Sequence, residues 1–314
     1  MPRFRPSHIA LSLSFVLGLA AAGLAPCSSV ARAADGDTPP DLSGEYTFTG
    51  TQPDSTPCHG TFVVKKRMTV STHGGPRYNS YDIKMTYAAG WKGMGVGTFI
   101  DGHFNFATAP ADKYLAVVTY RPMVLTPEMQ DLKRKLQEKE RSRSGGLLEF
   151  NIKGDPWWAD AWTYKHYGVF FLADGSWGFE NLGPEHLGDS PPLGDGEWAF
   201  NRFFYDNKGK RDILAFRSGS VAATVKGDAV EIKQRYLKSG SRELQDPNVN
   251  AGLMPDPNML VAVFNGSGSE AVGSFQPVGM TMTGHICESS DLSVASITLT
   301  VPDEVAKRNP GLFH

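Results

Sequence analysis

The sequence has few cysteines and little excess charge of either sign. Its 314 residues include 3 cysteines, and 31 lysine and arginine residues nearly balance 33 aspartate and glutamate residues, for a formal net charge of −2. Nucleic-acid-binding domains carry a basic stripe, so this balance argues against a nucleic-acid partner. A chain of this length can bury a large core without disulfide or metal staples, which excludes a small disulfide scaffold.

Standard catalytic and metal-binding motifs are also absent from the sequence. It contains no Gly-x-Ser-x-Gly elbow, no His-Glu-x-x-His pair and no Cys-x-x-Cys-His haem box. We therefore expect no cofactor and no metal. His59, His285 and Glu288 would form a metal site or an acid/base pair if the chain ends met, but isolated histidines identify ligands poorly. A structural role is the favoured interpretation for these three residues.

One long apolar run lies at the N-terminus. Residues 9–24 carry no charge and follow two arginines, and Ala31 and Ala33 place small side chains where a signal peptidase cleaves. A membrane anchor is the alternative, but a run of about sixteen residues is short for a span, and no second candidate follows. We expect residues 1–33 to be a signal peptide. The remaining chain would be exported to a periplasmic or extracellular location, without an integral membrane span.

Cleavage after residue 33 leaves two of the three cysteines. Cys27 ends a segment that resembles a lipid-attachment box, but Pro26 replaces the small residue that precedes the cysteine in such boxes, so we favour the later cleavage. Cys58 and Cys287 are then expected to form one disulfide, as a cysteine pair in an oxidising compartment usually does. Two free thiols are the alternative. The bridge would join the first strand region to the last.

Most of the chain alternates short strand-like segments with turn sequences. Residues 81–87 alternate apolar and polar side chains, the pattern of a strand with one buried face. Asp101-Gly102, Asp174-Gly175 and Gly227-Asp228 each separate two such segments and favour tight hairpin turns. The sequence therefore predicts an all-β fold of antiparallel strands, with one short helical insertion near 127–143.

The first strand carries a family resemblance. Gly44-Glu45-Tyr46 opens it after a polar leader, and a meander of hairpins follows. This pattern resembles the start of lipocalin-like (calycin) β-barrels, which have Gly-x-Trp at that point, with Tyr46 here replacing the tryptophan. The resemblance covers residues 44–180. It implies an up-and-down barrel with room for an apolar ligand.

A break rich in glycine and proline at 182–196 suggests where the chain divides. We expect the lipocalin-like barrel to occupy residues 34–182. A second antiparallel β unit would occupy residues 196–314, either as a separate domain or as a continuation of the first.

Aromatic residues concentrate between residues 157 and 198, which include five of the six tryptophans. Rings beside polar groups suit stacking against sugars and aromatic ligands, although aromatic residues also dominate ordinary cores. The expected ligand-binding residues are Trp157, Trp158, Trp162, Tyr164, His166, Tyr167 and Trp177.

These features favour an exported β-barrel protein that binds a small apolar, aromatic or glycan ligand without catalysis. Two alternatives remain open. One is a carbohydrate-active enzyme, a lyase or glycosidase, with acid/base groups near the tryptophans. The other is an envelope structural or interaction protein with an aromatic plug. The acid/base candidates are Asp155, Asp160, Asp174 and Glu180, or Tyr164 with His166.

Overall fold

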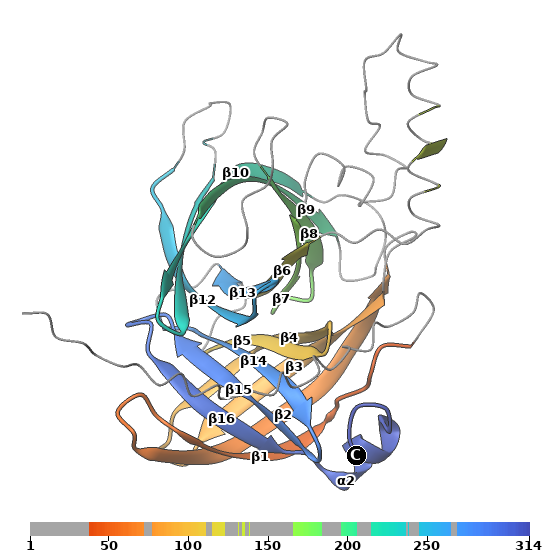
Figure 1. Ribbon diagram of the computed structural model, residues 1–314, viewed down its shortest axis with the longest axis vertical. Helices are drawn as coiled ribbons and strands as arrows, with labels where there is room; N and C mark the ends of the chain where they lie inside the picture. Colours follow the sequence, from red (N-terminus) through yellow and green to blue (C-terminus); the bar gives the residue numbers. More distant parts are fainter. Residues whose placement is uncertain are drawn as a thin grey trace, which may run out of the picture. The chain divides into compact units, whose positions relative to one another are not determined.

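The computed structural model describes residues 38–71, 77–110, 115–122, 166–183, 196–205, 215–236, 245–264 and 269–314, together with residues 131, 134, 135, 138 and 238. Strands dominate these ranges and close into two eight-stranded antiparallel barrels (Figure 1). Within the described ranges, no helix is long and apolar enough to cross a membrane.

The first barrel is built from both ends of the chain. Its strands are β1 (Gly44–Thr51), β2 (Pro57–Ser71), β3 (Arg77–Tyr87), β4 (Lys92–Ile100), β5 (His103–Ala109), β14 (Ala271–Val278), β15 (Thr281–Glu288) and β16 (Val294–Thr300). Each strand pairs with the next in this order, and β16 pairs with β1 to close the barrel. A short helix, α2 (Asp303–Arg308), follows β16.

The second barrel is formed by a continuous stretch of chain between β5 and β14. Its strands are β6 (Ala116–Pro122), β7 (His166–Leu172), β8 (Trp177–Gly183), β9 (Gly196–Tyr205), β10 (Ala215–Lys226), β11 (Ala229–Tyr236), β12 (Asn248–Asp256) and β13 (Met259–Phe264). Consecutive strands pair, and β13 pairs with β6. In the sequence, the segment that forms the second up-and-down barrel is thus inserted between two strands of the first, β5 and β14.

This arrangement confirms the all-β antiparallel class but not the expected division of the chain. Residues 34–182 supply strands to both barrels, and so do residues 196–314. Local hairpin signals identify strands that follow each other, whereas β5 pairs with β14, which lies far along the chain. The division of the chain between the two barrels is therefore set by pairing between distant strands, which turn sequences do not predict.

The predicted turns and the predicted helix are present where the structure describes them. Asp101 and Gly102 have φ values of 48° and 83°, and Gly175 and Gly227 also have positive φ. Such conformations explain the Asp-Gly and Gly-Asp dipeptides. The described residues 131, 134, 135 and 138 are helical. Their exposed side chains form ion pairs three or four residues apart, as expected for a solvated helix surface.

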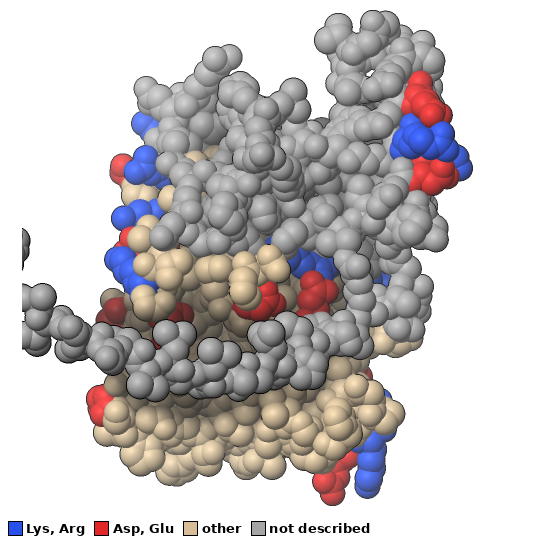
Figure 2. Space-filling model, viewed as in Figure 1, with Lys and Arg blue, Asp and Glu red and all other residues tan. Residues whose placement is uncertain are grey.

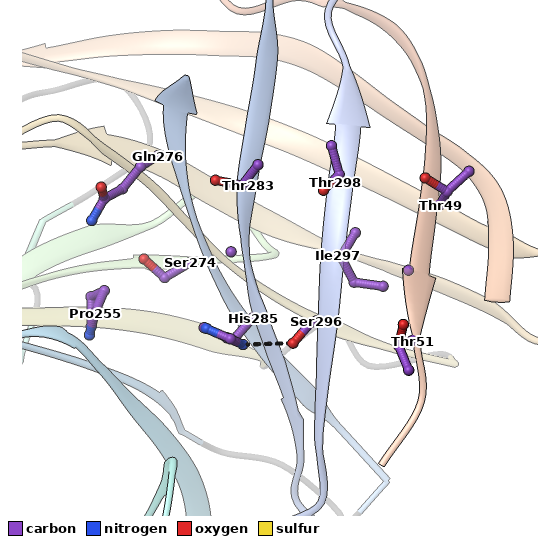
Figure 3. Close-up of a pocket in the computed structure, with 12 residues that line it drawn as sticks. Thr49, Thr51, Pro255, Ser274, Gln276, Thr283, His285, Ser296, Ile297 and Thr298 are labelled. Carbon is purple, nitrogen blue, oxygen red and sulfur yellow. Dashed lines mark hydrogen bonds between the residues drawn. The ribbon is translucent and has the colours of Figure 1, made fainter. Parts of the chain in front are cut away.

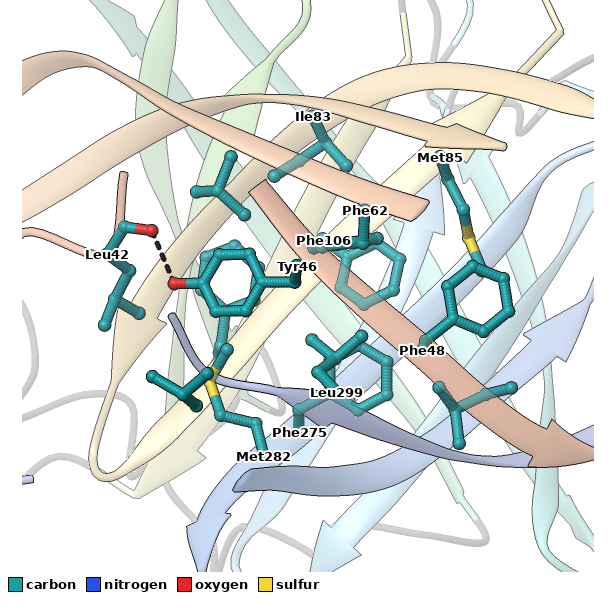
Figure 4. Close-up of a cluster of buried hydrophobic side chains, with 14 of the residues drawn as sticks. Leu42, Tyr46, Phe48, Phe62, Ile83, Met85, Phe106, Phe275, Met282 and Leu299 are labelled. Carbon is teal, nitrogen blue, oxygen red and sulfur yellow. Dashed lines mark hydrogen bonds between the residues drawn. The ribbon is translucent and has the colours of Figure 1, made fainter. Parts of the chain in front are cut away.

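Large apolar side chains fill the interior of the first barrel (Figure 4). The ring of Phe62 lies 4.9 to 6.1 Å, between centroids, from the rings of Phe104, Phe106 and Phe275. The Tyr46 hydroxyl donates a 2.6 Å hydrogen bond to the carbonyl oxygen of Leu42, so this buried phenol is satisfied. The first barrel therefore has a packed core.

The two barrels share an apolar interface. All seven residues of β5 are buried, because one face of the strand lines the first barrel and the other contacts the second. Asn105 bridges this interface: its Nδ2 donates to Thr119 Oγ1 at 3.1 Å, and Ser274 Oγ donates to its Oδ1 at 2.7 Å. Both barrels consequently belong to one compact unit.

The expected disulfide is not formed. Cys58 and Cys287 are both free thiols. Cys58 packs at the edge of the core inside the first barrel, whereas Cys287 is buried in the interface between the barrels. Side chains on opposite faces of a β-sheet wall cannot bond, so the two-free-thiols alternative is the correct one.

Candidate functional site

The expected ligand-binding residues fall mostly outside the described residues. Trp157, Trp158, Trp162 and Tyr164 all do. His166 and Tyr167 begin β7, where their backbones pair with Pro122 and Arg121. Trp177 is 3% exposed and packs in the interface between the barrels. The burial of Trp177 is accounted for by barrel packing.

Two of the four carboxylate candidates, Asp174 and Glu180, are described, and each already has a hydrogen-bond partner. Asp174 is exposed in the turn before β8 and accepts hydrogen bonds from the backbone N–H and the hydroxyl of Ser176, at 2.8 and 2.6 Å. Glu180 is fully buried and accepts a 2.7 Å hydrogen bond from the Tyr120 hydroxyl. Asp155 and Asp160 lie outside the described residues. Asp174 therefore acts as a turn residue, and Glu180 belongs to the interior of the second barrel.

The His59, His285 and Glu288 group is not assembled into one site. His59 pairs with Thr49, and His285 pairs with Ser274 and Ser296. His285 and Glu288 are an odd number of positions apart on β15, so they lie on opposite faces of the barrel wall. In the part of the chain that the structure describes, no three His, Cys, Asp or Glu side chains are grouped to hold a metal ion.

The interior of the second barrel differs from that of the first. Of the largest fully buried side chains in the described residues, six line the first barrel and two, Tyr120 and Phe170, line the second, whose described core also includes Phe264 and Tyr236. Glycine occurs where a larger side chain would collide: a Cβ on Gly168 would lie 2.6 Å from the Tyr120 ring. The remaining described core consists largely of alanine and of smaller aliphatic side chains.

Gln234 introduces a polar group into this interior. It lies on β11 opposite Val221, a member of the core, and is 1% exposed. Paired residues on neighbouring strands face the same side of a sheet, so the Gln234 amide points into the barrel. Neither its Nε2 nor its Oε1 has a hydrogen-bond partner among the described residues. Gln234 thus presents an unused donor and an unused acceptor in the same place.

Asn250 lies beside Gln234 on the next strand. Gln234 pairs with Asn248, and Ile232 pairs with Asn250, so Gln234 and Asn250 are diagonal neighbours, a spacing of about 7–8 Å. Asn250 is 2% exposed, and its Nδ2 also has no partner among the described residues. An unpaired buried polar group costs about 1–3 kcal/mol, so two adjacent ones are a substantial destabilisation. The pair is the strongest candidate for a ligand contact in the second barrel.

Gln234 was not among the residues expected from the sequence, although the sequence carries a signal for it. The buried face of β11 has Val230, Ile232 and Tyr236, and Gln234 occupies the same phase between them. A polar side chain among the buried apolar positions of a strand forms hydrogen bonds either with another residue of the protein or with a bound molecule.

No protein family, no curated protein and no solved structure matches this chain. Functional inference therefore rests on the geometry of the two barrels.

Proposed function

We propose that the protein is an exported, lipocalin-like binding protein that holds a small molecule inside its second barrel, without catalysis. The observation that carries this proposal is the buried Gln234 amide with no hydrogen-bond partner on either atom among the described residues. A closed up-and-down barrel of eight antiparallel strands is the architecture of lipocalins, which bind ligands inside. The proposed export rests on the N-terminal pattern of residues 1–33.

The second barrel is favoured over the first because of what fills each interior. The first barrel contains stacked and edge-on aromatic rings throughout. The described part of the second combines aliphatic side chains and the rings of Tyr120, Phe170, Tyr236 and Phe264 with the unpaired amides of Gln234 and Asn250. Ligand sites in proteins are mostly apolar with a few convergent polar groups, which describes the second interior.

The chemistry of the amide indicates the kind of ligand. A glutamine side chain offers an N–H donor and a carbonyl acceptor in one plane. A ligand edge with an N–H next to a carbonyl, as in a lactam, a cyclic imide or a pyrimidine, would satisfy both atoms at once. The Asn250 amide supplies a further donor, and the surrounding Val221 and Ile232 suit the apolar body of such a molecule.

The aromatic residues identified from the sequence remain proposed ligand contacts. Trp157, Trp158, Trp162 and Tyr164 belong to the connection between β6 and β7, two neighbouring strands of the second barrel, and His166 and Tyr167 begin β7.

The experiment is a thermal-shift comparison with caprolactam, succinimide and uracil, each beside its N-methylated form. We expect a rise in melting temperature with at least one N–H compound and a smaller rise with its methylated form, which lacks the donor. Gln234→Leu should remove the rise, and Gln245→Leu, which changes an exposed glutamine in the connection between β11 and β12, should retain it. Equal shifts in both variants, or no shift with any compound, would refute the proposal.

A further inference from the structure

A hollow lies on the outer wall of the first barrel. It has a volume of about 620 Å³ and is bounded by β1, β14, β15 and β16 on one side and by Pro255 of β12 on the other (Figure 3). This volume falls in the range of small-molecule sites, about 300–1,000 Å³. We call this hollow the outer groove. It is separate from the interior of the second barrel, and nothing in the proposed function uses it.

The wall of the outer groove is rich in hydroxyl groups and contains no aspartate, glutamate, lysine or arginine. The four strands carry nine serine and threonine residues, and all of them occupy outward-facing positions. Their only charged residues are Glu45 and Glu288, near strand ends, and neither lines the groove. Figure 2 accordingly shows a broad uncharged surface on the first barrel.

The strand register arranges the groove side chains in two rows across four strands. The upper row in Figure 3 is Gln276, Thr283, Thr298 and Thr49. The lower row is Ser274, His285, Ser296 and Thr51. Neighbours in a row are about 4.8 Å apart, and the rows are about 6.7 Å apart, as strand geometry dictates. The wall thus repeats the same chemistry at a fixed interval.

The threonine hydroxyls of the groove are available to a ligand. Thr49, Thr283 and Thr298 make no side-chain hydrogen bond to any described residue, whereas Ser274 Oγ is engaged by Asn105 and Gln276 Nε2 by His103. His285 Nδ1 lies 3.4 Å from Ser296 Oγ in the lower row. Each threonine hydroxyl can donate one hydrogen bond and accept others.

We propose that the outer groove binds a neutral oligosaccharide. Sugar hydroxyls can both donate hydrogen bonds to the serine and threonine hydroxyls of the wall and accept hydrogen bonds from them. The lining contains no lysine or arginine to form ion pairs with a sulfated or uronic glycan, which favours a neutral sugar. A polymer of identical rings suits a wall that repeats at a fixed interval. Because the lining has no aromatic platform, binding depends on hydrogen bonds and is weak, in the millimolar range, about 1 mM.

The test titrates the full protein with cellohexaose, maltohexaose and chitohexaose at up to about 10 mM and measures saturation-transfer NMR signals of the sugars. The groove variant is Thr283→Val with Thr298→Val, a directly paired couple. The matched control is Thr47→Val with Thr300→Val, a paired couple on the same face that does not line the groove. Valine keeps the β-branched shape and strand propensity of threonine, so both variants should fold.

We expect at least one hexasaccharide to bind, the groove variant to bind it about fivefold more weakly or worse, and the control to stay within about twofold. Ser296→Ala, a single change in the lower row, provides a milder second variant if the double variant melts early. Absence of binding for all three sugars overturns the proposal, and so does binding that the groove variants leave unchanged. Loss of binding in the control to the same extent would also overturn it, because the contact would then not be specific to the groove.

Discussion

Cys58 and Cys287 lie on opposite faces of the same barrel wall. Cys58 pairs with Gly50 and packs at the edge of the interior of the first barrel. Cys287 pairs with Val272 and Val294 and is fully buried against the second barrel. Burial raises the pKa of the Cys287 thiol to about 12, with smaller contributions from Asp291 and Glu288, so this group stays protonated at neutral pH.

The first prediction concerns thiol reactivity. Because a thiolate is the reactive form, Cys287 should resist iodoacetamide at pH near 8 in the folded protein, while the half-buried Cys58 reacts slowly. In denaturant without reductant, both cysteines should be alkylated, as peptide mass spectrometry will report. A linked Cys58–Cys287 peptide in the unreduced digest would contradict the structure.

The second prediction concerns acid stability and His103. Burial is the main cause that lowers the pKa of His103 below its usual 6.5, against an opposing hydrogen bond with the Asp101 carbonyl. The unfolded chain therefore takes up this proton first, so the His103 contribution to stability is complete above pH 6.5 and is lost as pH falls below it. Urea unfolding at pH values on both sides should show a smaller acid loss in His103→Asn than in the wild type. An identical loss in both would contradict this assignment.

The third prediction concerns the polar bridge between the barrels. Asn105→Ala removes the hydrogen bonds to Thr119 and Ser274 and a weaker one to the Met259 sulfur, and it leaves the two hydroxyls without that partner in an apolar interface. We expect a loss of about 2–4 kcal/mol in the free energy of unfolding. Thr119→Val breaks one of these bonds and should cost less. A cost within experimental error for Asn105→Ala would mean that the bridge does not hold the barrels together.

The fourth prediction concerns the glycines of β4. A Cβ on Gly95 would lie 1.7 Å from the carbonyl oxygen of Ala107 on the neighbouring strand, so Gly95→Ala forces the backbone apart. We expect a large loss of stability, roughly 2 kcal/mol or more, in thermal or urea unfolding. Gly311→Ala is the control, because a Cβ there meets nothing within 4 Å. Comparable melting temperatures for the two variants would contradict the close strand packing.

The fifth prediction concerns the stability cost of Gln234. If its amide is unpaired in the ligand-free protein, Gln234→Leu should stabilise that form by about 1–3 kcal/mol. Urea unfolding of both proteins, refolded from denaturant to remove bound molecules, measures the difference. A destabilised leucine variant would show that the amide is satisfied without a ligand.

Local sequence features predicted the strands and hairpins of this fold, but not the pairings between distant strands that close the first barrel. Asp101-Gly102 and Gly227-Asp228 identified hairpins correctly because their turn conformations favour those residues. The pairing of β5 with β14 and of β16 with β1 brings together segments that share no turn, so no short motif encodes it. The insertion of one barrel into the other was therefore not predictable from hairpin signals.

The sites show the same limit. The expected Cys58–Cys287 bridge was wrong. It was predicted from the expected oxidising compartment and the number of cysteines, and neither indicates which face of its strand each cysteine occupies. Gln234 was detectable from the phase of β11, but only the closed barrel shows that its amide is enclosed. The outer groove depends on the register of four strands from opposite ends of the chain, which the sequence pattern does not give.

The central claim is that a small molecule binds at the Gln234 amide inside the second barrel. The most direct measurement follows the side-chain N–H signals of Gln234 by ¹H–¹⁵N NMR, assigned by their loss in Gln234→Leu, during titration with the most stabilising N–H compound. The account predicts that these signals shift and saturate over the same concentrations that raise the melting temperature. Gln234 signals that stay in place while the compound stabilises the protein would contradict it.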